Sequence, residues 1–268
     1  MRQVVFITGV SSGFGKRIAV LLSSKGYTVY GTSRKDIDTD HNVTILKADV
    51  TDAASMKMAI DSVIKKEGRI DVVINNAGMG ISGAIEEFSL EDVKLQMGTN
   101  VMGVFNTLQA VLPIMRRQKD GLIINISSIG GLMGLPFQGF YSASKYAIEG
   151  LSEALRMEVK QFNIKIVVIE PGDFATNFTA NRKLVSNGTT NSAYKEQLSK
   201  SLAIIEKDEK GGMAPEFLAN KLLKIIESKN PCHRYVISSF EQKLAVCLKA
   251  ILPDSMFFKI LASHYGIK

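Results

Sequence analysis

The stretch TGVSSGFG, residues 8–15, decides the fold because it joins an apolar strand pattern to a helical one. VVFIT (4–8) leads into it, and a helical pattern begins near residue 14. Its glycines stand at positions 9, 13 and 15, and the absence of a Cβ lets backbone N–H groups at a helix N-terminus approach a phosphate. The spacing G-x-x-x-G-x-G differs from the standard G-x-G-x-x-G dinucleotide fingerprint. The stretch predicts a strand–turn–helix unit whose turn either binds an anion or is purely structural.

Short β-branched runs continue outward from this unit and alternate with helical patterns. The predicted strands lie at 4–8, 27–32, 43–49, 69–77, 121–127, 164–170 and 234–238. The predicted helices lie near 14–25, 53–67, 89–118, 141–162, 193–208 and 215–229. Several strands are apolar at consecutive positions, as expected when helices bury both faces of a sheet. The alternation predicts the α/β class, with a Rossmann-type, doubly wound sheet of seven parallel strands flanked by helices.

Length and composition favour one globular domain. The chain has 268 residues, of which 46 % are hydrophobic and 22 % charged, enough for one large core. We expect a single domain at 1–240 and an amphipathic helical extension at 241–268, split by Pro253. Cys232 and Cys247 lack metal-ligand spacing, and no signal peptide or membrane-spanning run is visible. We therefore expect a cytoplasmic protein with reduced cysteines and no metal site.

The net charge of +7 points to an anionic partner, but the basic residues are scattered and do not alternate with aromatic ones. Nucleic-acid interfaces normally gather their basic residues into a patch or stripe. A cofactor that carries phosphate needs only a few of these charges. We therefore expect a small-molecule partner and no nucleic acid.

The end of the second predicted strand, VYGTSRK, bears on which cofactor binds. In NAD-binding folds an acidic residue about 20 positions beyond the turn bonds the ribose 2′-hydroxyl. Ser33 stands at that position here, and Arg34 follows it. A hydroxyl and a guanidinium bind a 2′-phosphate, which a carboxylate would repel. The pattern favours NADP(H); the alternative is that Arg34 and Lys35 are a solvated loop pair.

Further motifs follow in a fixed order over residues 2–238. They are Asp49-Val50, NNAG (75–78), Asn100 in GTNVMG, Ser128 in NISS, Tyr141 and Lys145 in YSASK, and PGDFAT (171–176). Ser128 precedes Tyr141 by 13 residues. With TGVSSGFG, this ordered set resembles the short-chain dehydrogenase/reductase family, whose members are oxidoreductases with one Rossmann-type domain.

The resemblance implies a cofactor site built from several of these motifs. The expected cofactor-binding residues are Gly9, Ser11, Ser12, Gly13, Phe14, Gly15, Ser33, Arg34, Asp49, Val50, Asn76, Ala77, Gly78, Tyr141, Lys145, Pro171, Gly172, Phe174 and Thr176. In relatives the acidic pair position contacts adenine, NNAG lines the cofactor site, and the proline–glycine segment contacts nicotinamide.

The expected catalytic residues are Asn100, Ser128, Tyr141 and Lys145. Interconverting an alcohol and a carbonyl moves a proton with the hydride, and Tyr141 is its carrier by resemblance. A nearby ammonium favours phenolate, so we expect Lys145, one helical turn away, to lower the pKa of Tyr141 and to hold the nicotinamide ribose. Ser128 is expected to bond the substrate oxygen, and Asn100 to shape its helix and link a water to Lys145.

Apolar residues around these motifs bear on the substrate. They are Met79, Met133, Leu135, Phe137, Phe174 and Phe178. Apolar walls suit a bulky hydrophobic alcohol or ketone, and GLMGLPF resembles hydroxysteroid- and retinol-type members. We expect a steroid-, retinoid- or lipid-like substrate; the alternative is that these side chains are core.

Two segments depart from the regular alternation. Residues 172–214 are polar and contain glycine, as in a mobile lid over a site. The tail carries apolar residues at helical spacing flanked by lysines. We favour its packing on the domain or a neighbouring subunit over peripheral membrane contact. By analogy with relatives, we expect a homodimer or homotetramer.

The sequence thus predicts an NADP(H)-dependent oxidoreductase, of the carbonyl reductase or alcohol dehydrogenase type. Because cells keep the NADP pool reduced, we expect reduction to dominate. The rival interpretation is a catalytically silent NADP(H)-binding sensor or scaffold; a broken catalytic set would favour it, and the set here is intact.

Overall fold

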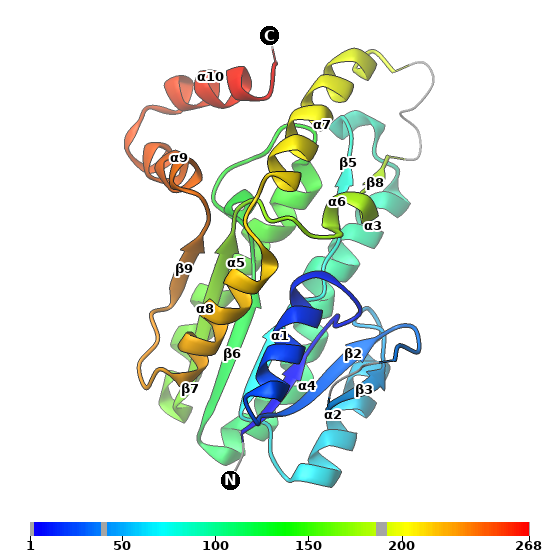
Figure 1. Ribbon diagram of the computed structural model, residues 1–268, viewed down its shortest axis with the longest axis vertical. Coiled ribbons are helices and arrows are strands. Elements are labelled where there is room, and N and C mark those ends of the chain that lie inside the picture. Colours follow the sequence, from blue (N-terminus) through cyan, green and yellow to red (C-terminus); the bar gives the residue numbers. More distant parts are fainter. Residues whose placement is uncertain (1–2, 39–41, 186–191, 268) are drawn as a thin grey trace.

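Seven parallel strands form the central sheet (Figure 1). The computed structural model describes residues 3–38, 42–185 and 192–267. The strands of this sheet are β1 (Val4–Ile7), β2 (Thr28–Ser33), β3 (Val43–Lys47), β4 (Val72–Asn75), β6 (Gly121–Ile126), β7 (Ile164–Pro171) and β9 (Arg234–Ile237). Their order is β3-β2-β1-β4-β6-β7-β9. The predicted doubly wound parallel sheet is confirmed, because the order reverses direction at β1, the strand that precedes the glycine turn.

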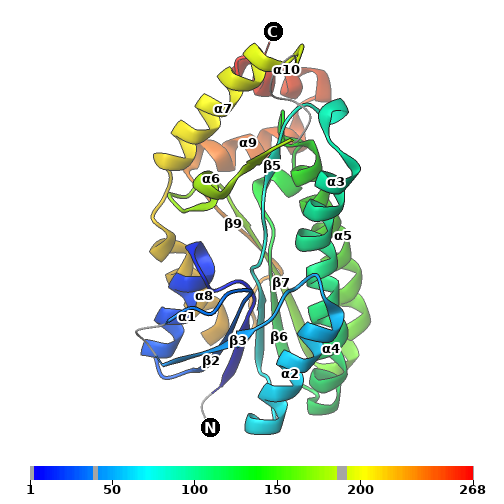
Figure 2. The ribbon, with the colours of Figure 1, turned by 90° about the vertical axis from the view of Figure 1, so that its right-hand side faces the viewer.

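Helices cover both faces of this sheet (Figure 2). The α-helices of the described residues are α1 (Gly13–Ser24), α2 (Ala53–Glu67), α3 (Leu90–Met97), α4 (Gly103–Gln118), α5 (Gly139–Val159), α6 (Phe178–Asn181), α7 (Lys195–Lys210), α8 (Pro215–Glu227), α9 (Phe240–Ile251) and α10 (Asp254–His264). In Figure 2, α1 and α8 lie on one face, and α2, α4 and α5 on the other. Two short strands, β5 (Ile81–Ser82) and β8 (Lys183–Leu184), pair in parallel outside the main sheet.

The continuous apolar runs are explained by this layering. All four residues of β1, VVFI, are buried, as are the four of β4 and the six of β6. Successive side chains of a strand point to opposite faces, so β1 sends Val4 and Phe6 into the core under α2 and α4. Val5 and Ile7 enter the second core, under α1 and α8. Two cores on one sheet require both faces of each central strand to be apolar.

The predicted helix 89–118 is two helices in the structure. A π-helical turn at Gly98–Met102 separates α3 from α4. Asn100, in this turn, donates from Nδ2 to the carbonyl of Met79 (2.9 Å) and to Ser144 Oγ (3.0 Å). Its Oδ1 accepts from the Met79 N–H (2.9 Å). A wider turn of this kind commonly occurs at functional sites, and here it turns the buried Asn100 amide towards α5 and the NNAG loop.

The tail folds back over the carboxyl ends of the strands, so that α7, α9 and α10 stand together at the top of Figure 1. Ser201 of α7 donates to the carbonyl of Tyr265 (2.9 Å), and His264 Nε2 lies 3.1 Å from Asp208 Oδ2. On α9, Phe240 and Ile251 are 80 % and 74 % exposed, so part of its apolar stripe faces outward. Among the described residues, no helix is long and apolar enough to cross a membrane.

Candidate active site

One cleft of about 320 Å³ opens where the strands end, beneath α7 and the tail. In open α/β sheets ligands bind outside the carboxyl ends of the strands, near the reversal of strand order. Every predicted cofactor-binding residue except Gly15 lines this cleft, as do Ser128, Tyr141 and Lys145. Side chains separated by more than 100 residues in the sequence are therefore brought to one site.

The glycine turn has the shape that a bound phosphate requires. Gly9 and Gly13 adopt φ values of +71° and +56°, which side-chain-bearing residues rarely adopt. A Cβ on Gly15 would lie 2.2 Å from the carbonyl oxygen of Gly9, so the turn closes only without one. Among the described residues, Ser12 caps α1 without a side-chain hydrogen bond, and the first turn of α1 carries no acidic residue. The N-terminus of α1 thus fits the pyrophosphate of a dinucleotide.

Two further groups extend this end of the cleft. Ser33 and Arg34, at the end of β2, line it next to the glycine turn, with Arg34 exposed. Asp49 lines it after β3 and uses Oδ1 to accept from the N–H and the hydroxyl of Thr51 (2.9 and 2.8 Å). We call Gly9, Ser11–Phe14, Ser33 and Arg34 the turn side of the cleft.

The NNAG loop is tied directly to the glycine turn. Asn76 donates from Nδ2 to the carbonyls of Thr8 and Gly9, both at 2.9 Å. Thr8 Oγ1 accepts from the N–H groups of Asn76 and Ala77, both at 3.0 Å. The two motifs therefore hold each other in place across the neighbouring strands β1 and β4.

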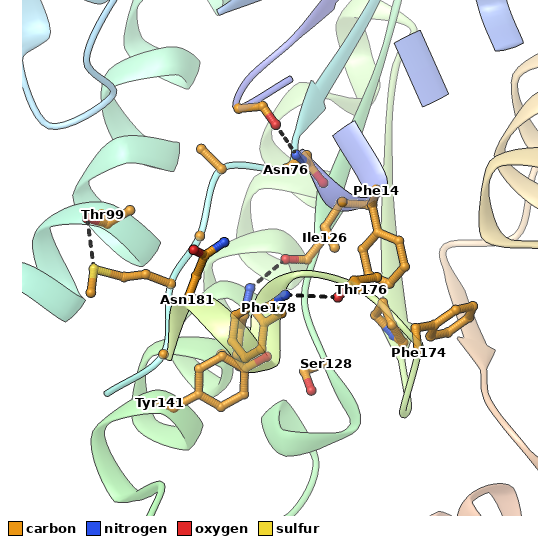
Figure 3. Close-up of a pocket in the computed structure, with 18 of the residues that line it drawn as sticks. Phe14, Asn76, Thr99, Ile126, Ser128, Tyr141, Phe174, Thr176, Phe178 and Asn181 are labelled. Carbon is orange, nitrogen blue, oxygen red and sulfur yellow. Dashed lines mark hydrogen bonds between the residues drawn. The ribbon is translucent and has the colours of Figure 1, made fainter. Parts of the chain in front are cut away.

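Tyr141 and Ser128 line the same part of the cleft (Figure 3). Tyr141 lies in the first turn of α5, and the Ser128 side chain is near enough to lower the pKa of its phenol as a hydrogen-bond partner. Ser128 Oγ also accepts from the N–H of Gly130 (3.0 Å), which caps the short turn after β6. That turn fixes the serine hydroxyl near the phenol, and the expected bond from Ser128 to a substrate oxygen stays a prediction.

Lys145 leaves α5 one turn beyond Tyr141 and is buried. Its Nζ donates to the carbonyl of Ile126 (2.8 Å) and lies 5.8 Å from the centre of the Tyr141 ring. Tyr146, by contrast, is 44 % exposed and is absent from the described lining of the cleft. Of these two tyrosines of α5, only Tyr141, on the same helix face as Lys145, lines the cleft.

Asn100 lies behind the described lining of the cleft rather than in it. Its bonds run to Met79 and to Ser144, and Ser144 Oγ donates to the carbonyl of Tyr141 (2.7 Å). It thus braces the NNAG loop against the first turn of α5. Its expected link to Lys145 through water stays a prediction.

The pKa values correct one expectation. We predicted that Lys145 lowers the pKa of Tyr141. This prediction is wrong, because the net shift of that pKa is upward. Desolvation in the cleft raises the pKa of Tyr141 to about 12; the hydrogen bond to Ser128 and the charge of Arg182 act downward, and Glu209 and Asp173 act upward. Burial also lowers the pKa of Lys145 to about 8, against the effect of Glu149. The Tyr141 phenol is therefore protonated at neutral pH.

The expected apolar walls are only partly formed. Met79, Leu135, Phe174 and Phe178 line the cleft. Phe178 packs on Tyr141 with ring centres 5.7 Å apart, and Phe174 packs edge-on against Phe14 at 5.0 Å (Figure 3). Met133 and Phe137 are absent from the described lining; Met133 is 2 % exposed, and Phe137 contacts the Tyr194 ring instead.

The sequence did not reveal a charged side of the cleft, formed by Asp173, Asp208, Glu209, Gln242 and Tyr265. We call these five residues the tail side. They come from the loop after β7, from α7, from α9 and from the residues after α10. The PGDFAT motif contains Asp173, but the motif assigned it no role. No sequence motif contains the other four residues, because only the folding of the tail brings them to the cleft.

Hydrogen bonds hold the tail side together. Gln242 donates from Nε2 to Asp173 Oδ2 (2.5 Å), and its Oε1 accepts from the Asp173 N–H (3.1 Å). Glu209 forms an ion pair with the buried Arg182 and accepts from the hydroxyl of Thr179 (2.6 Å). Burial, together with the charges of Glu209 and Asp208, raises the pKa of Asp173 to about 6. The tail side carries more negative than positive charge.

A parallel sheet with an anion-binding turn and a Tyr–Lys–Ser cleft is typical of dinucleotide-dependent oxidoreductases. The family model for short chain dehydrogenase matches residues 3–186. The chain therefore belongs to the short-chain dehydrogenase/reductase family.

Individual relatives cover almost the whole chain. A 3-ketodihydrosphingosine reductase from Bacteroides thetaiotaomicron is 48 % identical over 99 % of both chains. An NADPH-dependent 3-dehydrocapnine reductase from Ornithobacterium rhinotracheale is 31 % identical over 97 % of this chain and 96 % of its own. The crystal structure of a short-chain dehydrogenase from Streptomyces avermitilis superposes with a TM-score of 0.82, at 29 % identity, covering 97 % of this chain and 98 % of the other.

Proposed function

We propose that the protein uses NADPH to reduce the ketone of a long-chain, lipid-like substrate whose neighbouring carbon carries an amine. The observation that carries this proposal is that one cleft holds the Tyr141–Ser128 pair, a turn whose shape fits a phosphate, and three carboxylates. The similarity to the two named reductases supports the same substrate class.

Tyr141 is the proton donor in this proposal. Ser128 holds the substrate carbonyl oxygen beside the Tyr141 hydroxyl, and Lys145 holds the ribose of the cofactor. When bound, NADPH supplies a hydride for the carbonyl carbon. The Tyr141 O–H bond breaks as its proton moves to the carbonyl oxygen, so the ketone becomes a secondary alcohol. A pKa of about 12 keeps the phenol protonated at neutral pH, which supports reduction over oxidation.

Preference for NADPH rests on Ser33 and Arg34. Both line the turn side of the cleft, and the described lining has no carboxylate at the end of β2. A guanidinium forms forked, charge-assisted hydrogen bonds with a phosphate. One relative is named as NADPH-dependent, which supports the same preference here.

The tail side supports an amine in the substrate. The substrate named for the Bacteroides relative, 3-ketodihydrosphingosine, is a long-chain 2-amino-3-ketone, so its ammonium is next to the reacting carbonyl. Asp173, Asp208 and Glu209 line the cleft that holds Tyr141, and two of them act on the pKa of its phenol. Among the described residues, no cluster of His, Cys, Asp or Glu could hold a metal ion. An ammonium is the cation that we propose these carboxylates attract.

A matched pair of ketones tests the proposal. NADPH oxidation is followed by absorbance with 3-ketodihydrosphingosine and with the same long-chain ketone lacking the amine. We expect a kcat/KM about tenfold higher for the amino ketone, since a charge-assisted hydrogen bond contributes about 1.5 kcal/mol or more. Asp173→Asn should reduce this ratio and leave turnover of the amine-free ketone unchanged. Equal rates with both ketones would contradict recognition of the amine, and no turnover of either would contradict the proposed reaction.

The organisation around this site completes the proposal. Residues 1–240 form the catalytic domain, and residues 241–268 are an extension that completes its cleft. The contacts of Gln242 with Asp173 and of His264 with Asp208 support this division. A homo-oligomeric state and a cytoplasmic location stay predictions.

A further inference from the structure

We infer that Glu149 is a positioning residue that keeps Lys145 charged, and that Arg234 and Glu170 hold Glu149 in place for this task. The inference goes beyond the proposed substrate but rests on the proposed role of Lys145 in holding the cofactor.

Glu149 and Lys145 leave the same face of α5. They are four residues apart, one helical turn, and both are about 6 % exposed. Lys145 Nζ donates to the carbonyl of Ile126, which is neutral. An ammonium buried in this way needs a counter-charge. Glu149, one helical turn further along α5 and outside the described lining of the cleft, provides it.

Arg234, the first residue of β9, anchors Glu149. Its Nη2 donates to Glu149 Oε2 (2.9 Å), and the Glu149 side chain is 8 % exposed. Val168 of β7 pairs with Arg234 in the sheet, which places Glu170, two residues further on, on the same face. Arg234 Nε lies 2.7 Å from Glu170 Oε1. One guanidinium thus joins a helix carboxylate to a strand carboxylate.

Glu170 carries the shared proton of the two carboxyl groups. Glu149 Oε1 and both oxygens of Glu170 are buried, and among the described residues no N–H or O–H group donates to them. Burial and the charge of Glu149 raise the pKa of Glu170 to about 8. A protonated Glu170 would supply the missing O–H to Glu149 Oε1. The orphaned oxygens and the charge balance then both have an explanation.

The sign of the effect on Lys145 follows from these contacts. The charged groups around Lys145 and Glu149 are Glu170 from β7 and Arg234 from β9, with the exposed Glu153 also paired with Arg234 and the Tyr141 phenol on the cleft side. Burial lowers the pKa of Lys145 to about 8 and Glu149 opposes it. Removal of the Glu149 charge therefore shifts loss of the Lys145 proton to lower pH. It does not remove any group that touches substrate or cofactor.

The experiment measures protonation of Lys145 directly. Full-length protein labelled with ¹³C at lysine Cε is titrated by NMR without cofactor, and Lys145→Met assigns the resonance. We expect Glu149→Gln to lower the midpoint by about one pH unit, a tenfold change in the ionisation constant. The alkaline limb of kcat/KM should move by the same amount in the same direction. The NMR readout needs no turnover, so its result is separate from success or failure of the proposed reaction.

Two matched variants control for a general structural effect. Glu153→Gln removes the exposed carboxylate 3.3 Å from the same Arg234 Nη2 and should leave the midpoint unchanged. Glu170→Gln keeps a neutral donor opposite Glu149 and should also leave it unchanged. An unmoved midpoint in Glu149→Gln, or an equal shift in Glu170→Gln, would overturn the inference.

A double variant keeps the test valid if the single variant Glu149→Gln does not fold. Glu149→Gln leaves Arg234 partly unpaired, and an uncompensated buried charge is destabilising. The Glu149→Gln/Arg234→Leu protein removes both charges together. Its Lys145 midpoint should also fall, and a midpoint at or above that of the unaltered protein would contradict the role of Glu149.

Discussion

The turn side and the tail side of the cleft are built in opposite ways. The turn side uses backbone groups and glycines from β1, α1 and the end of β2, all within the first 34 residues. The tail side uses charged and polar side chains from four segments between Asp173 and Tyr265. Backbone N–H groups bind any pyrophosphate, whereas side-chain carboxylates select for the charge of one ligand. Under the proposed function, cofactor binding would depend on local sequence, and substrate selection would depend on residues far apart in the chain.

Tyr141 stands between the two sides, and its removal should have the largest effect. Tyr141→Phe deletes the proton donor but keeps the ring against Phe178. We expect kcat to fall about 10³-fold, within the range of general acid catalysis, with unchanged NADPH affinity. Steady-state kinetics and NADPH fluorescence titration measure the two quantities. Tyr146→Phe is the matched control and should retain full activity; a Tyr141→Phe enzyme with near-normal kcat would remove the assignment.

A side chain added at Gly15 should disrupt the backbone of the turn side. Gly15→Ala places a Cβ 2.2 Å from the carbonyl oxygen of Gly9. We expect a loss of about 3 kcal/mol in the free energy of unfolding, as for severe overpacking, and weaker NADPH binding. Urea denaturation checks the first. Gly150→Ala, on α5, is the control, because its new Cβ meets no atom of the described residues within 4 Å. This variant should be as stable as the native protein or more stable. Equal behaviour of the two variants would contradict a tight turn.

Arg34 is the residue of the turn side whose side chain is expected to set the preference for NADPH. Arg34→Asp replaces a phosphate-binding guanidinium with a repelling carboxylate, and we expect NADPH to bind about 10- to 100-fold more weakly. NADH has no 2′-phosphate and should lose far less. Titrations with both cofactors test this, and equal losses would show that Arg34 does not contact the 2′-phosphate.

The smallest of these effects should be a pH dependence of KM that comes from the tail side. The pKa of Asp173 is raised to about 6, so this carboxyl group is charged above pH 6 and becomes neutral as the pH falls through that value. We expect KM for the amino ketone to rise several-fold between pH 7 and pH 5, on the scale of one charge-assisted hydrogen bond. KM for the amine-free ketone should stay constant. A parallel rise for both ketones would point to a group other than Asp173.

Different parts of the fold and site were predictable for different reasons. The seven strands were visible because each needs an apolar run, and the sequence motifs named 19 of the residues that line the cleft, namely 18 expected cofactor-binding residues and Ser128. The π-helical turn at Asn100 was not visible, because its cause is a set of contacts with Met79 and Ser144 from distant segments. The sign of the Tyr141 pKa shift was also missed, since burial in the folded cleft outweighs the nearby ammonium.

The sequence by itself determined the strand–turn–helix unit of TGVSSGFG, the parallel sheet and the positions of Ser128, Tyr141 and Lys145, because these depend on local spacing and periodicity. Only the tertiary structure decided the charge of the cleft. Asp208, Glu209 and Tyr265 come together through contacts of α7 with α10 and the residue after it, and Gln242 is held at the cleft by Asp173. Contacts between segments far apart in the chain leave no periodic pattern in either one, so the tail side becomes visible only when the chain is folded.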